Sequence, residues 1–325
     1  MIGYYIHHQG SGHRTRAEAI ARHLSAPVVA LSSADIVGED FTDVIALDRD
    51  DQNLDHPRDP TAGGVLHWAP RGDRGLCRRM AQIARFADEH EPAAVVVDVS
   101  VEIALFVRLL GVPVIVVAMP GDRADPTHRR AYEVADAIIA PWPGDLYSPP
   151  WLDEFISKTT FVGGISRFEY RPATPDPALA SDVLLMSGTG GESERPVVSL
   201  ITKRHPGLTV VGLGPAFGTW TDDPWPYLCS AQVVVINAGQ GSVADVAAAR
   251  RPAVVIPQRR PFAEQDATAC TLEREGLAQV RSEWPEPDDW AKILHESSVT
   301  NADWSRWQTD GAAGRAAAAI EALLR

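Results

Sequence analysis

The sequence predicts an α/β protein with two doubly wound, Rossmann-like domains. Short runs that are apolar throughout alternate with helical patterns, which is typical of a parallel sheet covered by helices on both faces. The alternation stops once, at a proline-rich stretch, and then resumes. The 325 residues therefore divide into two units of ordinary domain size.

The N-terminal domain is expected to span residues 1–165. A helical pattern of Ala17, Ile20, Ala21 and Leu24 follows the first apolar run. The almost purely polar segment Asp48–Gly64 predicts a mobile loop over the ligand-binding crevice. The expected strands and helices, in chain order, are Ile2–Ile6, Arg14–Leu24, Val28–Leu31, Val44–Ala46, Leu76–Glu89, Ala94–Val97, Val101–Leu110, Val114–Val117 and Ala137–Ala140.

A proline-rich stretch at residues 166–181 is interpreted as an interdomain linker. The C-terminal domain then spans 182–310, and residues 311–325 form an alanine-rich helix expected to pack back across the linker. The elements expected in this domain are Val183–Met186, Pro196–Arg204, Leu208–Val211, Val233–Ile236, Ser242–Ala249, Ala253–Ile256 and Glu264–Glu275.

Composition excludes several classes of protein. The 30 Lys and Arg against 43 Asp and Glu leave a net charge of −13, which repels phosphate backbones, so no nucleic-acid partner is expected. The three cysteines have no short spacing and predict neither a disulfide framework nor a zinc site, as in a reducing cytoplasm. The N-terminal residues lack the pattern of a signal peptide, and the longest apolar region, Ile103–Met119, is interrupted by Arg108, Gly111 and Pro113. We therefore expect a cytoplasmic protein without a membrane span.

Three glycine-rich turns follow apolar strands: Gly10-Ser11-Gly12-His13, Ser187-Gly188-Thr189-Gly190-Gly191 and Asn237-Ala238-Gly239-Gln240-Gly241-Ser242. Such turns lie at the carboxyl ends of parallel strands, where ligands bind, and the amides of the next helix can hold a diphosphate. A helix N-terminus disfavours an imidazolium, so His13 is expected to be neutral and able to accept a proton. The alternative is an ordinary exposed residue of the first turn.

The turns do not match two common nucleotide motifs. Thr15 stands where the third glycine of a dinucleotide fingerprint belongs, and the Gly-Lys of a P-loop is absent. His7 and His8 are expected to pack at the end of the first strand, and no carboxylate stands at metal-ligand spacing from these histidines. Asp245 has a structural alternative, since an acidic residue in the first helical turn suits the helix dipole.

The C-terminal turn and the residues after it resemble the donor signature of nucleotide-sugar glycosyltransferases of the GT-B fold, families 1 and 28. The resemblance covers both domains and implies two Rossmann-like domains facing each other across a cleft. It implies that residues 239–242 hold the donor diphosphate, Asp245 the ribose, and Glu264 and Gln265 the sugar hydroxyls. The Ser187-Gly188-x-Gly190 turn is a candidate for the diphosphate because of its glycines and the helix after it. Two residues depart from the signature. Asn237 replaces a phosphate-contacting histidine and Asp245 replaces a glutamate, so an altered donor preference is expected. The residues that carry the resemblance are Asn237, Gly239, Gln240, Gly241, Ser242, Asp245, Pro252, Pro257, Glu264 and Gln265.

The N-terminal turn, from His8 to Ala17, resembles the glycine-rich turn of the peptidoglycan transferase that makes lipid II and of related bacterial and plastid enzymes. In those families the histidine matching His13 is the proposed base, and Gly12 belongs to the same turn. Asp98 matches the aspartate that pairs with the catalytic histidine in family 1. Such a carboxylate orients the imidazole and stabilises its charged form. The structural alternative is that Asp98, with Ser100 beside it, caps the next helix.

The resemblance implies an inverting glycosyltransferase that needs no metal or other cofactor, with a UDP-sugar donor and a dTDP-sugar as the open alternative. A nucleotide-sugar hydrolase, a 2-epimerase and a non-catalytic sugar-nucleotide sensor on the same fold are the rival interpretations. Asp48-Arg49-Asp50 has the form of a metal-binding D-x-D motif but is interpreted as a solvated loop.

The acceptor is left open between a small molecule and a lipid-linked one, and oligomeric state is not predicted. Arginines around one helix start would suit an anionic acceptor or peripheral contact with the inner membrane, or would form a hydrated face. Several tryptophans in loop-like contexts would stack on acceptor rings or pack in the core. These residues are Arg71, Arg74, Arg78 and Arg79, and Trp68, Trp142, Trp151 and Trp220.

Overall fold

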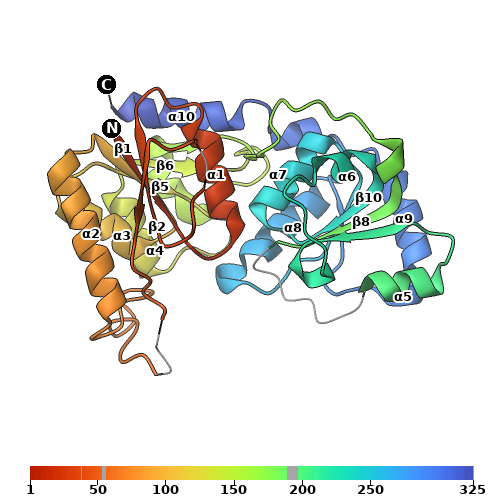
Figure 1. Ribbon diagram of the computed structural model, residues 1–325, viewed down its shortest axis with the longest axis horizontal. Helices are drawn as coiled ribbons and strands as arrows, with labels where there is room; N and C mark the ends of the chain where they lie inside the picture. The colour runs from red at the N-terminus through yellow and green to blue at the C-terminus, as the bar shows by residue number, and fades with distance from the viewer. Residues whose placement is uncertain (38, 53–55, 189–196, 325) are drawn as a thin grey trace.

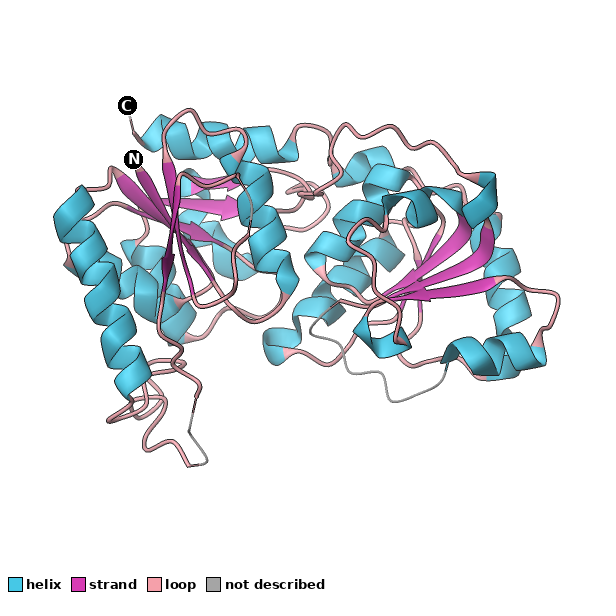
Figure 2. Ribbon diagram, in the orientation of Figure 1, coloured by secondary structure: helices cyan, strands magenta, loops and turns pink. Residues whose placement is uncertain are grey.

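The computed structural model describes residues 1–37, 39–52, 56–188 and 197–324, which form two lobes side by side (Figure 1). Each lobe has a parallel sheet at its centre with helices on both faces (Figure 2). The prediction of two Rossmann-like domains is therefore confirmed. We call the lobe that contains the first sheet, residues 1–165, the N-terminal lobe, and the one that contains the second, residues 182–310, the C-terminal lobe.

The N-terminal lobe has its strands in the order β3-β2-β1-β4-β5-β6-β7. The central strands are buried along their whole length, which explains why their sequences are apolar throughout. The strands are β1 (Ile2–Ile6), β2 (Val28–Ser32), β3 (Asp43–Ala46), β4 (Ala94–Asp98), β5 (Val114–Val117), β6 (Ala137–Ala140) and β7 (Thr159–Phe161).

The helices of this lobe begin where the sequence supplies caps. Asp73 accepts a hydrogen bond from the Leu76 amide at the start of α2, and Ser100 accepts one from the Ile103 amide at the start of α3. Ser100 therefore makes the cap that had been an alternative role for Asp98. The helices are α1 (Ser11–Ala21), α2 (Arg74–His90), α3 (Val101–Leu109), α4 (Pro126–Val134) and the 3₁₀ helix η1 (Pro150–Lys158).

The C-terminal lobe has its strands in the order β12-β11-β10-β8-β9. They are β8 (Ser181–Met186), β9 (Val210–Leu213), β10 (Ala231–Ile236), β11 (Ala253–Val255) and β12 (Gln279–Val280). Its helices are α5 (Val197–Arg204), α6 (Trp225–Ser230), α7 (Gln240–Ala249), α8 (Glu264–Arg274) and α9 (Trp290–Ser298). Short 3₁₀ turns are η2 (Pro177–Leu179), η3 (Pro215–Phe217), η4 (Pro261–Ala263), η5 (Pro287–Asp289) and η6 (Trp304–Trp307).

The C-terminal helix α10 (Ala312–Leu323) crosses back to the N-terminal lobe and lies beside α1 (Figure 1). Its small buried side chains, with Ile320, join the same apolar cluster as Ile2, Ile20 and Val96. Alanines allow this close approach of the helix to the sheet. The last helix therefore completes the core of the first lobe as well as spanning the linker region.

Several sequence-based expectations need correction. Arg79 does not belong to a hydrated face: it is 2% exposed and donates hydrogen bonds to Asp50, Tyr5 and Ser33, whereas Arg71, Arg74 and Arg78 are exposed. Asp50 is accordingly not a solvated loop residue. Trp142 is a core residue at 1% exposure. Cys77, Cys229 and Cys270 are free, and no helix in the described ranges is long and apolar enough to cross a bilayer.

Candidate active site

The cleft between the lobes gathers residues from the carboxyl ends of both sheets. α1 begins there after β1, and α7 begins there after β10. A cavity of about 270 Å³ occupies the cleft. Its lining includes these predicted site residues: Gly12, His13, Ser187, Gly188, Asn237, Gly239, Gln240, Gly241, Ser242, Asp245, Glu264 and Gln265. Asp98 lies behind His13, and Gly190 falls outside the described residues.

His13 and Asp98 form a hydrogen-bonded pair at the edge of this cleft. Register brings them together, because β1 pairs with β4 so that Ile6 lies opposite Asp98, and the Gly10 turn (φ 83°) then starts α1. His13 Nδ1 lies 2.9 Å from Asp98 Oδ1. When Nδ1 carries the proton and donates to the carboxylate, the Nε2 lone pair is left to accept a proton from another molecule.

The carboxylate of Asp98 is completely buried yet remains ionised. Burial acts to raise its pKa, but Arg16 and His13 outweigh this effect, so the pKa lies well below the usual range. Arg16 donates from Nε to Oδ2 at 2.9 Å and from Nη2 to Oδ1 at 2.6 Å. A buried carboxylate with this fork of donors is an acceptor only, which favours the Nδ1–H form of His13.

The backbone directly after Asp98 is strained. Val99 has φ 63°, in the left-handed region that β-branched residues avoid. Such a conformation costs on the order of 1–3 kcal/mol and persists where surrounding contacts determine it. Here it turns the chain sharply between the end of β4 and the Ser100 cap of α3.

The start of α7 leaves open space toward the cleft. A Cβ added at Gly239 or at Gly241 would meet no atom within 4 Å, so a ligand can approach the backbone closely. The first amides of α7 have no partners within the helix and carry partial positive charge, which suits a diphosphate. Asn237 has another contact: its Nδ2 donates to the Ile256 carbonyl at 2.9 Å and so ties β10 to the end of β11.

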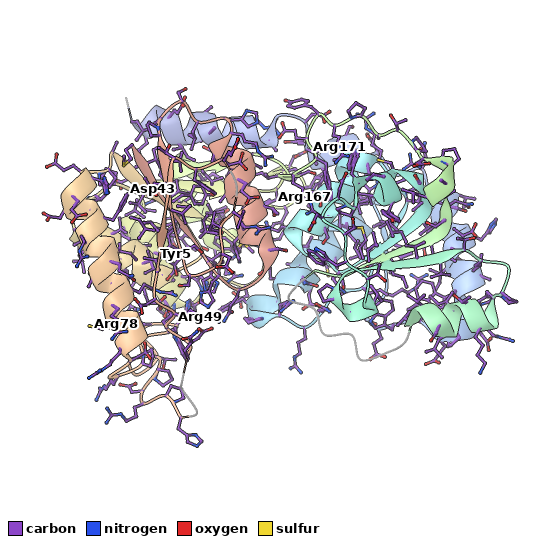
Figure 3. All side chains as sticks on the ribbon, viewed as in Figure 1. Tyr5, Asp43, Arg49, Arg78, Arg167 and Arg171 are labelled. Carbon is purple, nitrogen blue, oxygen red and sulfur yellow. The ribbon has the colours of Figure 1, made fainter. Side chains whose placement is uncertain are left out.

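Asp245 is the sixth residue of α7, not a residue of its first turn, because the helix begins at Gln240. It therefore does not have the helix-dipole role considered from sequence. It is 6% exposed and accepts from Ser166 Oγ at 2.7 Å and from Arg167 Nε at 3.3 Å. Burial raises its pKa to about 6, against the opposing effect of Arg167. Figure 3 labels Arg167 on the chain segment between the two lobes.

The segment before Glu264 joins the lobes. The Phe262 carbonyl accepts from the Asp122 amide at 2.7 Å, and its ring lies under the guanidinium carbon of Arg123 at 4.6 Å. Arg123 Nη2 also donates to Glu264 Oε2 at 3.4 Å. Gln265 Oε1 accepts from the Gln258 amide at 2.8 Å. Both residues predicted to hold the donor sugar are thus fixed by contacts beside the cleft.

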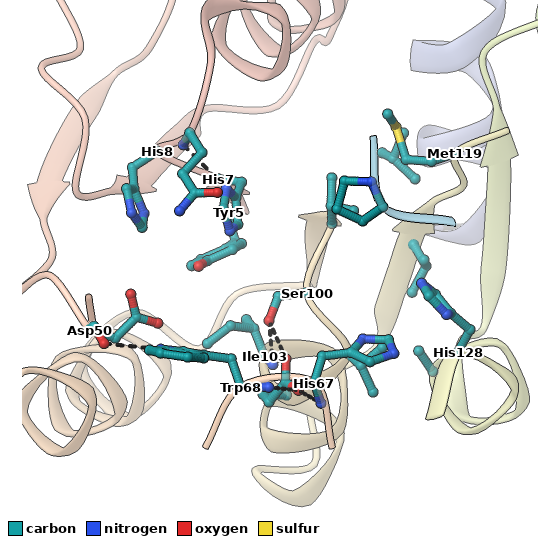
Figure 4. Close-up of a pocket in the computed structure, with 18 of the residues that line it drawn as sticks. Tyr5, His7, His8, Asp50, His67, Trp68, Ser100, Ile103, Met119 and His128 are labelled. Carbon is teal, nitrogen blue, oxygen red and sulfur yellow. Dashed lines mark hydrogen bonds between the residues drawn. The ribbon is translucent and has the colours of Figure 1, made fainter. Parts of the chain in front are cut away.

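A second cavity, of about 500 Å³, opens in the N-terminal lobe at the carboxyl ends of its strands. His7 and His8 lie at its edge rather than being plain packing residues, and Trp68, His67 and His128 line other walls (Figure 4). Phe262 of the C-terminal lobe also lines it. No sequence pattern pointed to His67, His128 or Phe262, because they come from separate segments with no common motif.

Two side-chain clusters at this cavity have metal-ligand composition: His67 with Asp125 and His128, and His8 with Asp50 and Asp51. In the first, Arg123 donates to His128 Nε2 at 3.0 Å, whereas a metal-bound imidazole needs an acceptor there. Burial lowers the pKa of His128 to about 4, which keeps it neutral. In the second, Arg79 pairs with Asp50 and Arg49 with Asp51. The guanidinium groups of these arginines therefore neutralise both carboxylates, and no metal ion is needed to do so.

Comparison with known proteins shows which fold this is. Neither a protein-family model nor a curated protein matches the chain. Solved structures do match: a glycotransferase of kitacinnamycin (17% identity, TM-score 0.71, 100% of this chain and 99% of that one) and the spinosyn forosaminyltransferase SpnP (14%, 0.70, 99% and 98%). MurG of Acinetobacter baumannii matches at 16% identity and TM-score 0.60, over 99% of this chain and 100% of that one. The chain therefore has, over its whole length, the two-lobed GT-B fold of these glycosyltransferases.

Proposed function

We propose that this protein is an inverting glycosyltransferase that moves a sugar from a nucleoside diphosphate, preferably UDP, to an acceptor hydroxyl. The observation that carries the proposal is the His13–Asp98 pair at a cleft whose opposite wall is the open glycine turn of α7. A base and an anion-binding helix end therefore face the same space.

In the proposed reaction the acceptor lies in the N-terminal lobe and its hydroxyl approaches His13. Nε2 takes the hydroxyl proton as the oxygen bonds to the anomeric carbon, and the bond from that carbon to the diphosphate breaks on the opposite face. Asp98 stabilises the imidazolium that forms. Amides at the start of α7 meet the charge on the departing diphosphate, so the reaction needs no metal ion in this proposal.

The donor is proposed to be held by residues of the C-terminal lobe that line the cleft. Gly239, Gly241 and Ser242 are proposed to hold the diphosphate, and Glu264 and Gln265 the sugar hydroxyls. Asp245 would reach a ribose only by exchanging its contacts with Ser166 or Arg167. A uridine ribose offers a diol for this exchange, whereas a thymidine sugar lacks the 2′-hydroxyl.

The cavity of the N-terminal lobe favours transfer over hydrolysis. A hydrolase needs room for one water molecule, about 30 Å³, beside the base. The cavity of the N-terminal lobe is about 500 Å³ and has aromatic walls from Trp68, Tyr132 and Phe262. It reaches the neighbourhood of the base through His7, which lines it and whose ring centre lies 5.7 Å from that of His13. It suits a compact acceptor with a ring better than a bare water.

The test is UDP release from a panel of UDP-sugars, with and without a library of phenolic and alicyclic alcohols. We expect release to depend on the acceptor, with a glycoside product of inverted configuration. Rapid release from a UDP-sugar alone would instead identify a hydrolase.

Replacing the proposed base gives the sharper measurement. His13→Ala should lower turnover at least about a hundredfold, with UDP affinity little changed, because a general base acts in the transition state. His23→Ala is the matched control, since His23 is an exposed histidine just beyond the same helix. Full activity of His13→Ala would refute the proposed mechanism.

A further inference from the structure

Arg16 connects the two lobes through the buried end of α1. Its side chain is 7% exposed, and two of its nitrogens hold the Asp98 carboxylate. The third, Nη1, donates at 2.8 Å to Oε1 of Gln240, the first residue of α7 in the other lobe. One guanidinium therefore contacts both the His13–Asp98 pair and the turn proposed to hold the donor.

The same guanidinium also competes for His13. Arg16 Nη2 lies 3.1 Å from His13 Nδ1, and Asp98 Oδ1 lies 2.9 Å from that same nitrogen. Nδ1 can donate to the carboxylate or accept from the guanidinium, but not both. In the first tautomer Nε2 has the lone pair that a base needs. In the second tautomer Nε2 carries the proton and cannot act as a base.

The groups beside His13 keep definite charge states. Burial acts to lower the pKa of Arg16, but Asp98 outweighs it and the pKa is raised, so the ion pair stays charged. His7, whose ring centre lies 5.7 Å from that of His13, stays neutral because burial lowers its pKa to about 3. Asp98, Arg16 and His7 are thus the groups facing the imidazole, and of these only the guanidinium also contacts the opposite lobe.

We propose that Arg16 is a positioning residue that favours the Nδ1–H tautomer of His13 while Gln240 anchors its guanidinium. This rests on the proposed function of His13 as a base. With Nη1 bound to Gln240, Nε bound to Asp98, and Nη2 bound to Asp98 and to Met119 Sδ at 3.5 Å, each nitrogen of the guanidinium has a partner and Nδ1 is left to donate to the carboxylate. Without the anchor, a buried N–H loses its partner, and the guanidinium turns to recover one at Nδ1. His13 therefore has the tautomer of a base only while the Arg16–Gln240 contact joins the two lobes.

Two variants separate the anchor from the ion pair. Gln240→Ala removes the contact across the cleft and leaves the Arg16–Asp98 pair intact. Arg16→Lys keeps the positive charge but loses the two parallel hydrogen bonds to the Asp98 carboxylate. The control is Arg22→Gln, because Arg22, exposed at the C-terminal end of α1, makes the same forked contact to Asp40, at 2.8 and 2.9 Å.

The main readout is the ¹⁵N spectrum of the histidine rings in the full-length protein, recorded without ligand and again with UDP added, with His13 assigned from its own substitution. We expect the native protein to show a protonated Nδ1 and a free Nε2. Gln240→Ala should move His13 toward the opposite tautomer, and Arg22→Gln should not. This readout does not require turnover, so it can fail or succeed independently of the proposed function.

Kinetics supply the second readout once a donor and acceptor pair is known. Gln240→Ala should lower kcat about tenfold while KM for the donor changes less, and its effect should not add to that of Arg16→Lys. An unchanged His13 tautomer in Gln240→Ala would overturn the proposal, as would additive effects in the double variant. If Arg16→Lys does not fold, the tautomer in Gln240→Ala alone decides.

Discussion

The buried carboxylate of Asp245 should make the protein less stable as the pH rises toward neutrality, and Asp245→Asn should remove that loss. Burial raises its folded-state pKa to about 6, from an ordinary value of 3.8. The folded protein therefore holds this proton more tightly than the unfolded chain. The stabilisation is full below pH ~4 and is lost as the pH rises through ~6. A difference of about 2 pH units corresponds to ~3 kcal/mol.

The assay is denaturant unfolding between pH 4 and pH 7, followed for both proteins in the same buffers. The free energy of unfolding of Asp245→Asn minus that of the native protein should grow by up to ~3 kcal/mol over this range. The control is Asp223→Asn. Arg171 lowers the pKa of Asp223, which is 46% exposed, so a small effect of opposite sign is expected. Parallel stability curves for Asp245→Asn and the native protein would refute the reasoning.

Two further predictions concern the contact between the lobes and the catalytic pair. Gly121→Ala should lower the free energy of unfolding, measured by thermal unfolding, by at least ~1 kcal/mol more than the control Gly111→Ala. Both glycines have positive φ, but only at Gly121 would a Cβ lie 2.2 Å from the Phe262 carbonyl oxygen. Equal decreases in the free energy of unfolding would contradict this prediction and show that the Phe262 segment moves away from the added Cβ at little cost. Asp98→Asn should lower turnover about a hundredfold or more and destabilise the fold by ~3–5 kcal/mol, since it leaves Arg16 buried without its partner. Because the pKa of Asp98 is lowered, its contribution is present above pH ~4 and lost on acidification, so the deficit measured by unfolding should shrink at low pH.

Local pattern was sufficient for the strands that are buried on both faces and for the glycine turns that follow them. Strands buried on both faces must be apolar along their whole length, so β1, β4 and β10 were recognisable as continuous runs. Elements without such a run, such as the edge strand β7 and the two-residue β12, were missed. α4 was also missed, although Asp125 as its cap and Pro126 in its first turn are a readable start signal.

The location of the candidate site followed from the sequence for a physical reason. In a parallel sheet every strand ends at the same edge, so a glycine turn after any strand must face the crevice. His13 and Gly239 follow this rule, and both line the cleft cavity. The partner of His13 came from family resemblance, and register then brings Asp98 opposite the end of β1.

What the sequence by itself determined is the strands buried on both faces, the turns that follow them and the side of each sheet on which ligands bind, because these depend on local apolar runs and on the parallel order of the strands. Only the tertiary structure decided that Arg79 is buried, that α10 completes the first core, and that His128 and Phe262 share one cavity wall. The same holds for Arg16, whose partners are 82 and 224 residues away. Such pairings depend on how segments far apart in the chain pack together, within one lobe or between the two, and no periodicity along the sequence records that geometry.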